Sequence, residues 1–165
     1  MRELMKKRSA RLAATPPEVG RIENRAIAGV PVRIYTPSGA AARRPAYIYA
    51  HGGGFVVGEL DMVETLCATI CRDAGIVVVS VDYRLAPEHK FPAGLDDVIA
   101  VTRWIAAHGG DIGIDTTRLA IGGDSAGGNL AASTAQALAG DGIAFKLQVL
   151  VYPVTDLTCS QPSYK

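Results

Sequence analysis

Short apolar runs that alternate with helix-like segments place the strongest constraint on how this chain folds. The run at 76–81, Ile-Val-Val-Val-Ser-Val, is rich in β-branched residues and lacks a polar face, as is typical of a strand covered on both sides. Because strands that alternate with helices of this length form parallel sheets with helices on both faces, the pattern predicts an α/β fold. The expected strands are 23–28, 32–36, 46–50, 76–81, 119–122 and 147–152, and the expected helices are 61–74, with Asp61 as N-cap, 95–107 and 125–139.

Size and charge bound the function classes. The 165 residues suit one domain, and a net charge of +1 gives no electrostatic reason to expect nucleic acid or an anionic membrane as a partner. No apolar run approaches the roughly 20 residues that cross a bilayer. The basic stretch from Arg2 to Arg11 leads into Thr15-Pro16-Pro17 without an apolar segment. We therefore expect no secretory signal and no membrane span, and a cytoplasmic location.

Cysteine usage fits that location. Cys67, Cys71 and Cys159 are odd in number and not tightly spaced, so they do not build a disulfide framework. Cys67 and Cys71 share an apolar stripe of the expected helix at 61–74 and should lie in the core. The chain has no cluster of His, Cys and carboxylate residues with zinc spacing, so we expect no metal.

One glycine-rich turn carries a candidate nucleophile. Gly123-Asp124-Ser125-Ala126-Gly127 matches G-x-S-x-G and lies between an expected strand and an expected helix. Such a turn holds the serine in strained backbone geometry and projects its hydroxyl above the carboxyl edge of the sheet, with the helix N-terminus favouring negative charge beside it. Larger side chains at Gly123 and Gly127 should collide with adjacent backbone. A plain strand-to-helix turn or a dinucleotide phosphate cradle would also be glycine-rich, but no G-x-G-x-x-G is present.

A second glycine-rich loop favours the nucleophile interpretation. His51-Gly52-Gly53-Gly54-Phe55 directly follows the expected strand at 46–50. Lipases and esterases use a loop of this type to present backbone N–H groups to the developing oxyanion. A flexible loop without a ligand is the alternative for this motif alone. The two motifs in this order together predict acyl-transfer chemistry.

Four sequence blocks resemble the bacterial hormone-sensitive-lipase-like esterases, which are α/β hydrolases. They are HGGGF (51–55), DYRLAPEHKFPAGLDD (82–97), GDSAGGNLA (123–131) and VYP (151–153), in the order of that family. The resemblance runs from about residue 20 onward and implies hydrolysis of short- to medium-chain carboxylic esters without a cofactor. It also implies that residues 1–20 are part of an N-terminal cap. Residues 21–165 would be the N-terminal part of the catalytic domain, ending after about the sixth strand.

The resemblance assigns roles to individual residues. Ser125 matches the nucleophile, and Gly53, Gly54 and Ala126 match the N–H donors of the oxyanion hole. His51, with Gly52, matches a loop support and not the catalytic base. Asp82 joins them as a loop support, in a polar network with its neighbours that braces the loop near the site. That network comprises Asp82, Tyr83, Arg84 and Glu88, whereas His89 and His108 are expected to be structural or exposed.

The sequence after Ser125 contains no histidine that could serve as the catalytic base, and no carboxylate there is assigned as the catalytic acid. In α/β hydrolases the chain order is serine, acid, histidine, but all three histidines here precede Ser125. Asp156 is a candidate acid, although the resemblance places that residue after a later strand. We therefore expect a second polypeptide to supply the acid, the histidine and further strands, because the strand at 147–152 would otherwise be an apolar unpaired edge. Cleavage, a shorter gene or a chosen chain boundary would each account for the end at Lys165.

Three functions fit these residues, with a small-molecule ester as the expected ligand of the first. The leading one is a serine carboxylesterase whose isolated 165 residues are nearly inactive. A non-catalytic small-molecule receptor on the same fold, as in plant gibberellin receptors, would keep the pocket without a working triad. Peptidase activity uses the same catalytic parts. Association between identical copies stays open.

Overall fold

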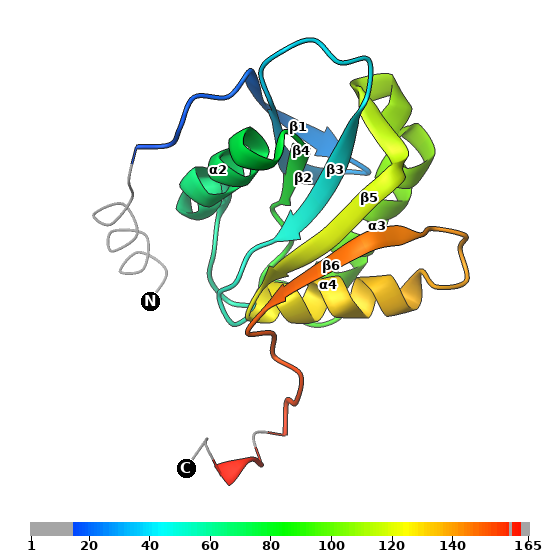
Figure 1. The fold of residues 1–165 in the computed structure, drawn as a ribbon. Coiled ribbons are helices and arrows are strands. Elements are labelled where there is room, and N and C mark those ends of the chain that lie inside the picture. The colour runs from blue at the N-terminus through cyan, green and yellow to red at the C-terminus, as the bar shows by residue number, and fades with distance from the viewer. Residues whose placement is uncertain (1–14, 159, 163–165) are drawn as a thin grey trace.

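The computed structural model describes residues 15–158 and 160–162, so the basic stretch from Arg2 to Arg11 and most of the expected cap segment at 1–20 lie outside the described residues. The elements form one six-stranded sheet with helices on both sides (Figure 1). The strands are β1 (Arg21–Ile27), β2 (Val30–Thr36), β3 (Arg44–Ala50), β4 (Val77–Val81), β5 (Ile114–Asp124) and β6 (Phe145–Val151). The helices are η1 (Leu60–Val63), α2 (Glu64–Ala74), α3 (Ala93–His108), η2 (Gly109–Ile112) and α4 (Ala126–Ala137), of which η1 and η2 are 3-10 helices.

The sheet has the order β1-β2-β4-β3-β5-β6. Strands β4, β3, β5 and β6 pair in parallel, whereas β1 and β2 form an antiparallel hairpin whose second strand joins β4. The carboxyl ends of the parallel strands therefore meet at one edge, where the loops after β3 and β5 lie side by side. This arrangement confirms the predicted α/β fold with a mostly parallel sheet.

Two hydrophobic clusters hold the helices against the sheet. On one face, α2 contributes Cys67, Ala68 and Cys71, which pack against tyrosines of β2 and β3. On the other face, α3 and α4 pack side chains such as Val101 and Leu130 against the sheet. All five residues of β4 are buried, as expected of a central strand covered on both sides. The two cysteines are core residues, as predicted.

The prediction that Asp61 caps a helix is wrong. A 3-10 turn, η1, comes first, and α2 begins at Glu64 with Val63 as its N-cap. The Asp61 carboxylate instead lies 2.9 Å from a guanidinium nitrogen of Arg33 on β2. The ion pair holds the start of this segment to the sheet, so the side chain is not used for capping.

Other differences concern element ends. Strand β5 is longer than the expected 119–122, because its start pairs with β3 across a register shift. Helix α4 ends at Ala137 and not at 139. Among the described residues, no helix is both long and apolar enough to cross a membrane.

Candidate active site

Ser125 occupies a strained backbone position between β5 and α4. Its φ of 52° and ψ of −118° lie outside the regions that L-residues commonly adopt, at a cost of order 1–3 kcal/mol. Hydrogen bonds fix this geometry: its N–H donates to the Val151 carbonyl at 2.9 Å, and its own carbonyl accepts from Asn129 and Val154 at 3.1 Å. The residue remains partly exposed. The turn therefore presents Ser125 at the carboxyl edge of the sheet, as the motif predicts.

The glycines beside Ser125 are required by close backbone contact. A Cβ at Gly123 would lie 2.2 Å from the carbonyl oxygen of Ala50, and one at Gly127 would lie 2.0 Å from the same oxygen. Both distances are far below a van der Waals contact. At these two positions the strand β3 and the elbow approach too closely for any side chain, which agrees with the predicted collisions.

The loop after β3 brings further backbone N–H groups to the same edge. Gly53 and Gly54 have φ angles of 132° and 62°, which favour glycine. The Gly53 carbonyl accepts hydrogen bonds from Val56 and Val57 at 3.1 and 3.0 Å, which makes the loop a tight turn. A Cβ at Gly53 would meet the Val57 carbonyl oxygen at 1.9 Å, so only glycine fits there.

Three N–H groups at this edge lack an acceptor among the described residues. None of the oxygens of the described residues accepts a hydrogen bond from the N–H of Gly53, Gly54 or Ala126. Ala126 is the first residue of α4, where helix N–H groups have no partner within the helix. These groups suit an oxyanion, because a donor aimed at developing negative charge is worth about 10²–10³ in rate.

Asp124 joins the loop to the elbow. Its Oδ1 accepts a hydrogen bond from the Tyr49 hydroxyl at 2.6 Å and one from the Gly52 N–H at 2.8 Å. A Cβ at Gly52 would lie 2.1 Å from Asp124 Oδ2, so the contact also requires glycine at 52. Burial, followed by the hydrogen bond to Asp124, raises the pKa of Tyr49 far above its usual value. The tyrosine therefore stays protonated and keeps donating. Sequence reasoning placed Asp124 in the elbow but missed Tyr49.

Replacing Asp124 tests this contact. We expect Asp124→Ala to lower the free energy of unfolding by about 1–3 kcal/mol, because the Tyr49 hydroxyl and the Gly52 N–H lose their acceptor. For a chain of this size that corresponds to a fall in Tm of about 2–4 °C per kcal/mol. Asp124→Asn keeps an accepting oxygen and should restore most of the loss. Thermal unfolding and hydrogen exchange of the Gly52 amide measure both effects, and equal destabilisation by the two variants would contradict the assignment.

His51 is held as part of the loop. It is buried, its ring stacks on Tyr83 with centroids 4.4 Å apart, and the Tyr83 hydroxyl donates to its carbonyl at 2.7 Å. Nδ1 lies 2.8 Å from the Gly52 carbonyl oxygen. Burial lowers the pKa of His51, although the Gly52 carbonyl and the Asp82 carboxylate act in the opposite direction. For the half-buried Asp82 carboxylate, burial acts in the opposite direction and raises the pKa. This geometry suits the predicted loop support.

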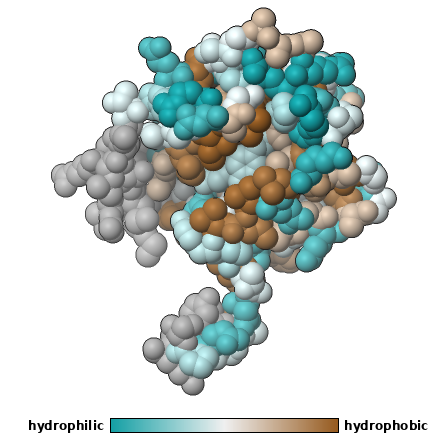
Figure 2. Space-filling model, viewed as in Figure 1, coloured by the Kyte–Doolittle hydropathy of each residue, from teal (hydrophilic) through white to brown (hydrophobic). Residues whose placement is uncertain are grey.

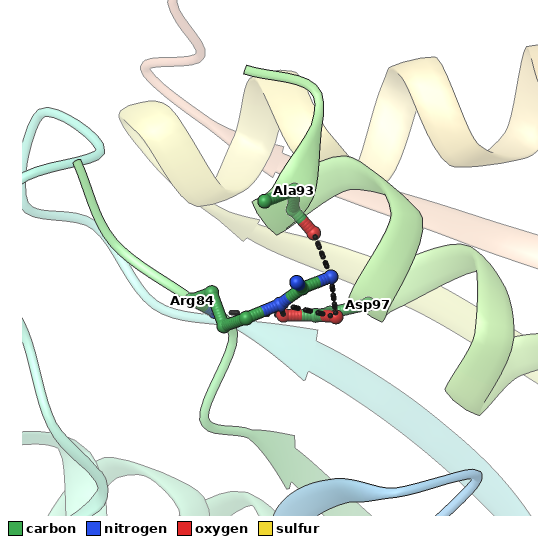
Figure 3. A network of polar contacts seen from close by, with 3 residues as sticks. All are labelled: Arg84, Ala93 and Asp97. Carbon is green, nitrogen blue, oxygen red and sulfur yellow. Dashed lines mark hydrogen bonds and ion pairs between the residues drawn. The ribbon is translucent and has the colours of Figure 1, made fainter. Parts of the chain in front are cut away.

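Two residues of the expected polar network, Tyr83 and Arg84, make well-defined contacts. Tyr83 braces His51, but Arg84 pairs with Asp97 of α3, which sequence reasoning did not single out (Figure 3). Asp97 accepts from the Arg84 backbone N–H at 2.8 Å and from guanidinium Nε and Nη2 at 3.0 and 2.8 Å. Because Asp97 is buried, these charge-assisted bonds fix the segment after β4 to α3.

A pocket of about 380 Å³ opens beside the oxyanion loop. It is lined by Gly54, Phe55, Val56, Tyr83, Arg84, Ala86, His89, Phe91, Pro92, Gly94, Leu95, Asn129, Leu130, Ser133 and Leu157. His89 is exposed on its wall, whereas the ring of the exposed His108 lies 5.3 Å from that of Trp104.

Hydrogen bonds from Thr158 lower the pKa of the Asp156 carboxylate, which sits in a local turn. Among the described residues, no group of three His, Cys, Asp or Glu side chains could hold a metal ion.

A strained serine between a strand and a helix, beside unpaired N–H groups of the loop after an earlier strand, is the arrangement of α/β hydrolases. A family model described as an alpha/beta hydrolase fold matches residues 47–165. The chain belongs to this family, and within it to the hormone-sensitive-lipase-like group.

Two similar proteins and one similar solved structure are ester hydrolases by name. The chain is 46% identical over 138 residues to an ethyl acetate hydrolase of Pseudomonas putida, a match that covers 81% of this chain and 43% of that protein. It is 43% identical over 160 residues to carboxylesterase NlhH of Mycobacterium tuberculosis, covering 91% of this chain and 50% of the relative. The solved structure of ester-hydrolase EH1AB1, from the metagenome of Lake Arreo, matches with a TM-score of 0.92 and 42% identity, covering 98% of this chain and 53% of that one. The chain thus spans about half the length of these relatives.

Proposed function

We propose that this chain supplies the nucleophile and oxyanion hole of a serine carboxylesterase that acts on short- to medium-chain acyl esters. The observation that carries the proposal is the strained Ser125 in contact, through Asp124 and Gly52, with a loop whose N–H groups lack acceptors. Backbone strain of this kind is stored where a side chain must be held in a fixed position. The apolar pocket beside Gly54 offers room for an acyl or alcohol group.

The chemistry follows from these positions. The Ser125 oxygen would bond to the ester carbonyl carbon while its proton passes to a histidine base. The carbonyl oxygen, now negative, would accept from the N–H groups of Gly53, Gly54 and Ala126. Collapse of this intermediate expels the alcohol, which takes the proton and leaves an acyl group on Ser125. Water then attacks the acyl carbon by the same route, releasing the acid and restoring the serine.

The base and the acid would come from polypeptide outside these 165 residues. His51 is buried beneath the loop, and the other two histidines lie on the pocket wall and beside Trp104. The relatives, which are ester hydrolases by name, are about twice as long as this chain. We propose that a complementary C-terminal polypeptide, or a continuation of the chain, carries an aspartate or glutamate and a histidine to Ser125.

Substrate turnover tests this function. The completed chain, defined as this sequence joined to the half of carboxylesterase NlhH that it does not match, should hydrolyse p-nitrophenyl butyrate but not the corresponding anilide. Ser125→Ala should abolish the turnover. Equal turnover of the anilide would indicate a peptidase, and saturable binding of the ester without turnover would indicate a receptor. Either result would overturn the proposal.

A further inference from the structure

The segment that ends β6 and follows it contacts Ser125 at both of its backbone polar groups. The Ser125 N–H donates to the Val151 carbonyl at 2.9 Å, and the Ser125 carbonyl accepts from the Val154 N–H at 3.1 Å. These contacts come from residues three positions apart in the chain, yet they meet the same residue. Segment 151–154 therefore holds the strained backbone of Ser125 from outside the elbow.

Segment 151–154 is itself strained. Tyr152 has a φ of 35°, in the left-handed region that favours glycine. Other residues persist in such a conformation where the surrounding structure holds them. Residues 152–154 belong to neither a helix nor a strand, so contacts with neighbouring elements set their position. Figure 1 shows this segment passing the first turn of α4, and in Figure 2 the residues after it project from the body of the molecule.

One side chain of α4 binds the segment. Asn129 Nδ2 donates to the Val154 carbonyl oxygen at 2.7 Å. Val154 is thereby held at both of its backbone polar groups, by Asn129 at the carbonyl and by Ser125 at the N–H. The backbone N–H of Asn129 also donates to the Ser125 carbonyl, at 3.1 Å. Ser125, Asn129 and Val154 therefore form a closed ring of three hydrogen bonds.

A close contact beside Asn129 keeps the segment against the helix. A Cβ at Gly128 would lie 3.0 Å from the Cβ of Pro153 and 3.1 Å from the Gly123 carbonyl oxygen. Pro153 therefore packs directly on the backbone of the first turn of α4. Two neighbouring residues of the helix, Gly128 and Asn129, thus contact two neighbouring residues of the segment, Pro153 and Val154.

We propose that Asn129 is a positioning residue, which acts through Val154 to hold Ser125 in its strained backbone conformation. This inference rests on the proposed function, in which Ser125 is the nucleophile. The Asn129 side chain keeps the serine hydroxyl aligned with the N–H groups of the oxyanion loop, and a misplacement of about 1 Å can lower a rate about a hundredfold. Because Asn129 also lines the pocket, the test has to separate positioning from contact with the substrate.

Replacing Asn129 in the completed chain provides that test. Asn129→Ala should lower kcat for p-nitrophenyl butyrate by about tenfold to a hundredfold, while KM changes by less than about twofold. The backbone amides of Ser125 and Val154 should exchange their hydrogens about five to ten times faster, because one hydrogen bond of the ring is lost. Steady-state kinetics and amide hydrogen exchange measure the two effects.

Two further variants sharpen the result. Asn129→Asp has nearly the same size, but an ionised carboxylate has no hydrogen to donate to the Val154 carbonyl. It should therefore lower kcat at least as far as Asn129→Ala. Gln136→Ala is the matched control, because it removes the same carboxamide group from an exposed position of the same helix. It should leave kcat and both exchange rates unchanged. Thermal unfolding checks that each variant is folded at the assay temperature.

Each outcome bears on the inference. Lower kcat and faster exchange in both Asn129 variants would support it. A higher KM with unchanged kcat would show that Asn129 contacts the substrate, and wild-type kcat in Asn129→Asp would show that donation to Val154 is not needed; either would overturn it. So would unchanged exchange of the Ser125 and Val154 amides. If the wild-type completed chain does not hydrolyse the ester, the proposed function fails, and the exchange rates alone then decide whether Asn129 holds Ser125.

Discussion

The 165-residue chain alone should hydrolyse p-nitrophenyl butyrate about a million times more slowly than the completed chain. Without a histidine to accept its proton, the Ser125 hydroxyl is an ordinary alcohol, and in an unrelated serine protease loss of the histidine alone has an effect of about this size. The N–H groups of Gly53, Gly54 and Ala126 would still stabilise an oxyanion, so a small rate above that of water should remain.

The control for this comparison is Ser125→Ala, made in the isolated 165-residue chain and in the completed chain. Because nucleophile and base act as a unit, the substitution should lower the hydrolysis rate of the completed chain by nearly a million-fold. It should lower the rate of the isolated chain only slightly. Steady-state rates with p-nitrophenyl butyrate measure all four proteins. Full activity of the isolated chain would show that one of its own histidines serves as the base, and the proposed partner would then be unnecessary.

Gly127→Ala should be the most disruptive single-methyl change in the elbow. The new Cβ would lie 2.0 Å from the Ala50 carbonyl oxygen and 2.5 Å from that of His51, so α4 and β3 must move apart. Overpacking of this kind costs about 1–3 kcal/mol and more where backbone resists, which lowers Tm by about 2–4 °C for each kcal/mol.

Gly140→Ala is the matched control for that change. Among the described residues, no atom beyond Gly140 and its two chain neighbours lies within 4 Å of the added Cβ. Its effect should stay within about 0.5 kcal/mol, as for most surface substitutions. Thermal unfolding of the two variants gives the comparison. Equal melting temperatures would mean that the contact between the elbow and β3 is not as close as the structure shows.

Local patterns in the sequence predicted the fold and the two loops well. The β-branched run at 76–81 is the buried β4, and the serine turn joins β5 to α4. These predictions succeeded because hydrophobic periodicity and glycine spacing act over a few residues. Element ends were less accurate: η1 precedes α2, and Asp61 pairs with Arg33 across the chain.

Local sequence patterns did not predict contacts between residues that lie far apart in the chain. Tyr49 and Asp124 are 75 positions apart, and only the parallel pairing of β3 with β5 brings them together. The Arg84–Asp97 pair depends on which face of α3 is buried. The alternation of tyrosines in β3, with Tyr47 and Tyr49 on one face, was the available signal for the first contact, but it does not identify the hydrogen-bond partner.

The most direct test of the account is the site at which an organophosphonate ester labels the completed chain. Peptide mass spectrometry should find one adduct, on Ser125, that forms as hydrolytic activity is lost and is absent from Ser125→Ala. An adduct on another residue, or loss of activity without any adduct on Ser125, would contradict the claim that this serine is the nucleophile.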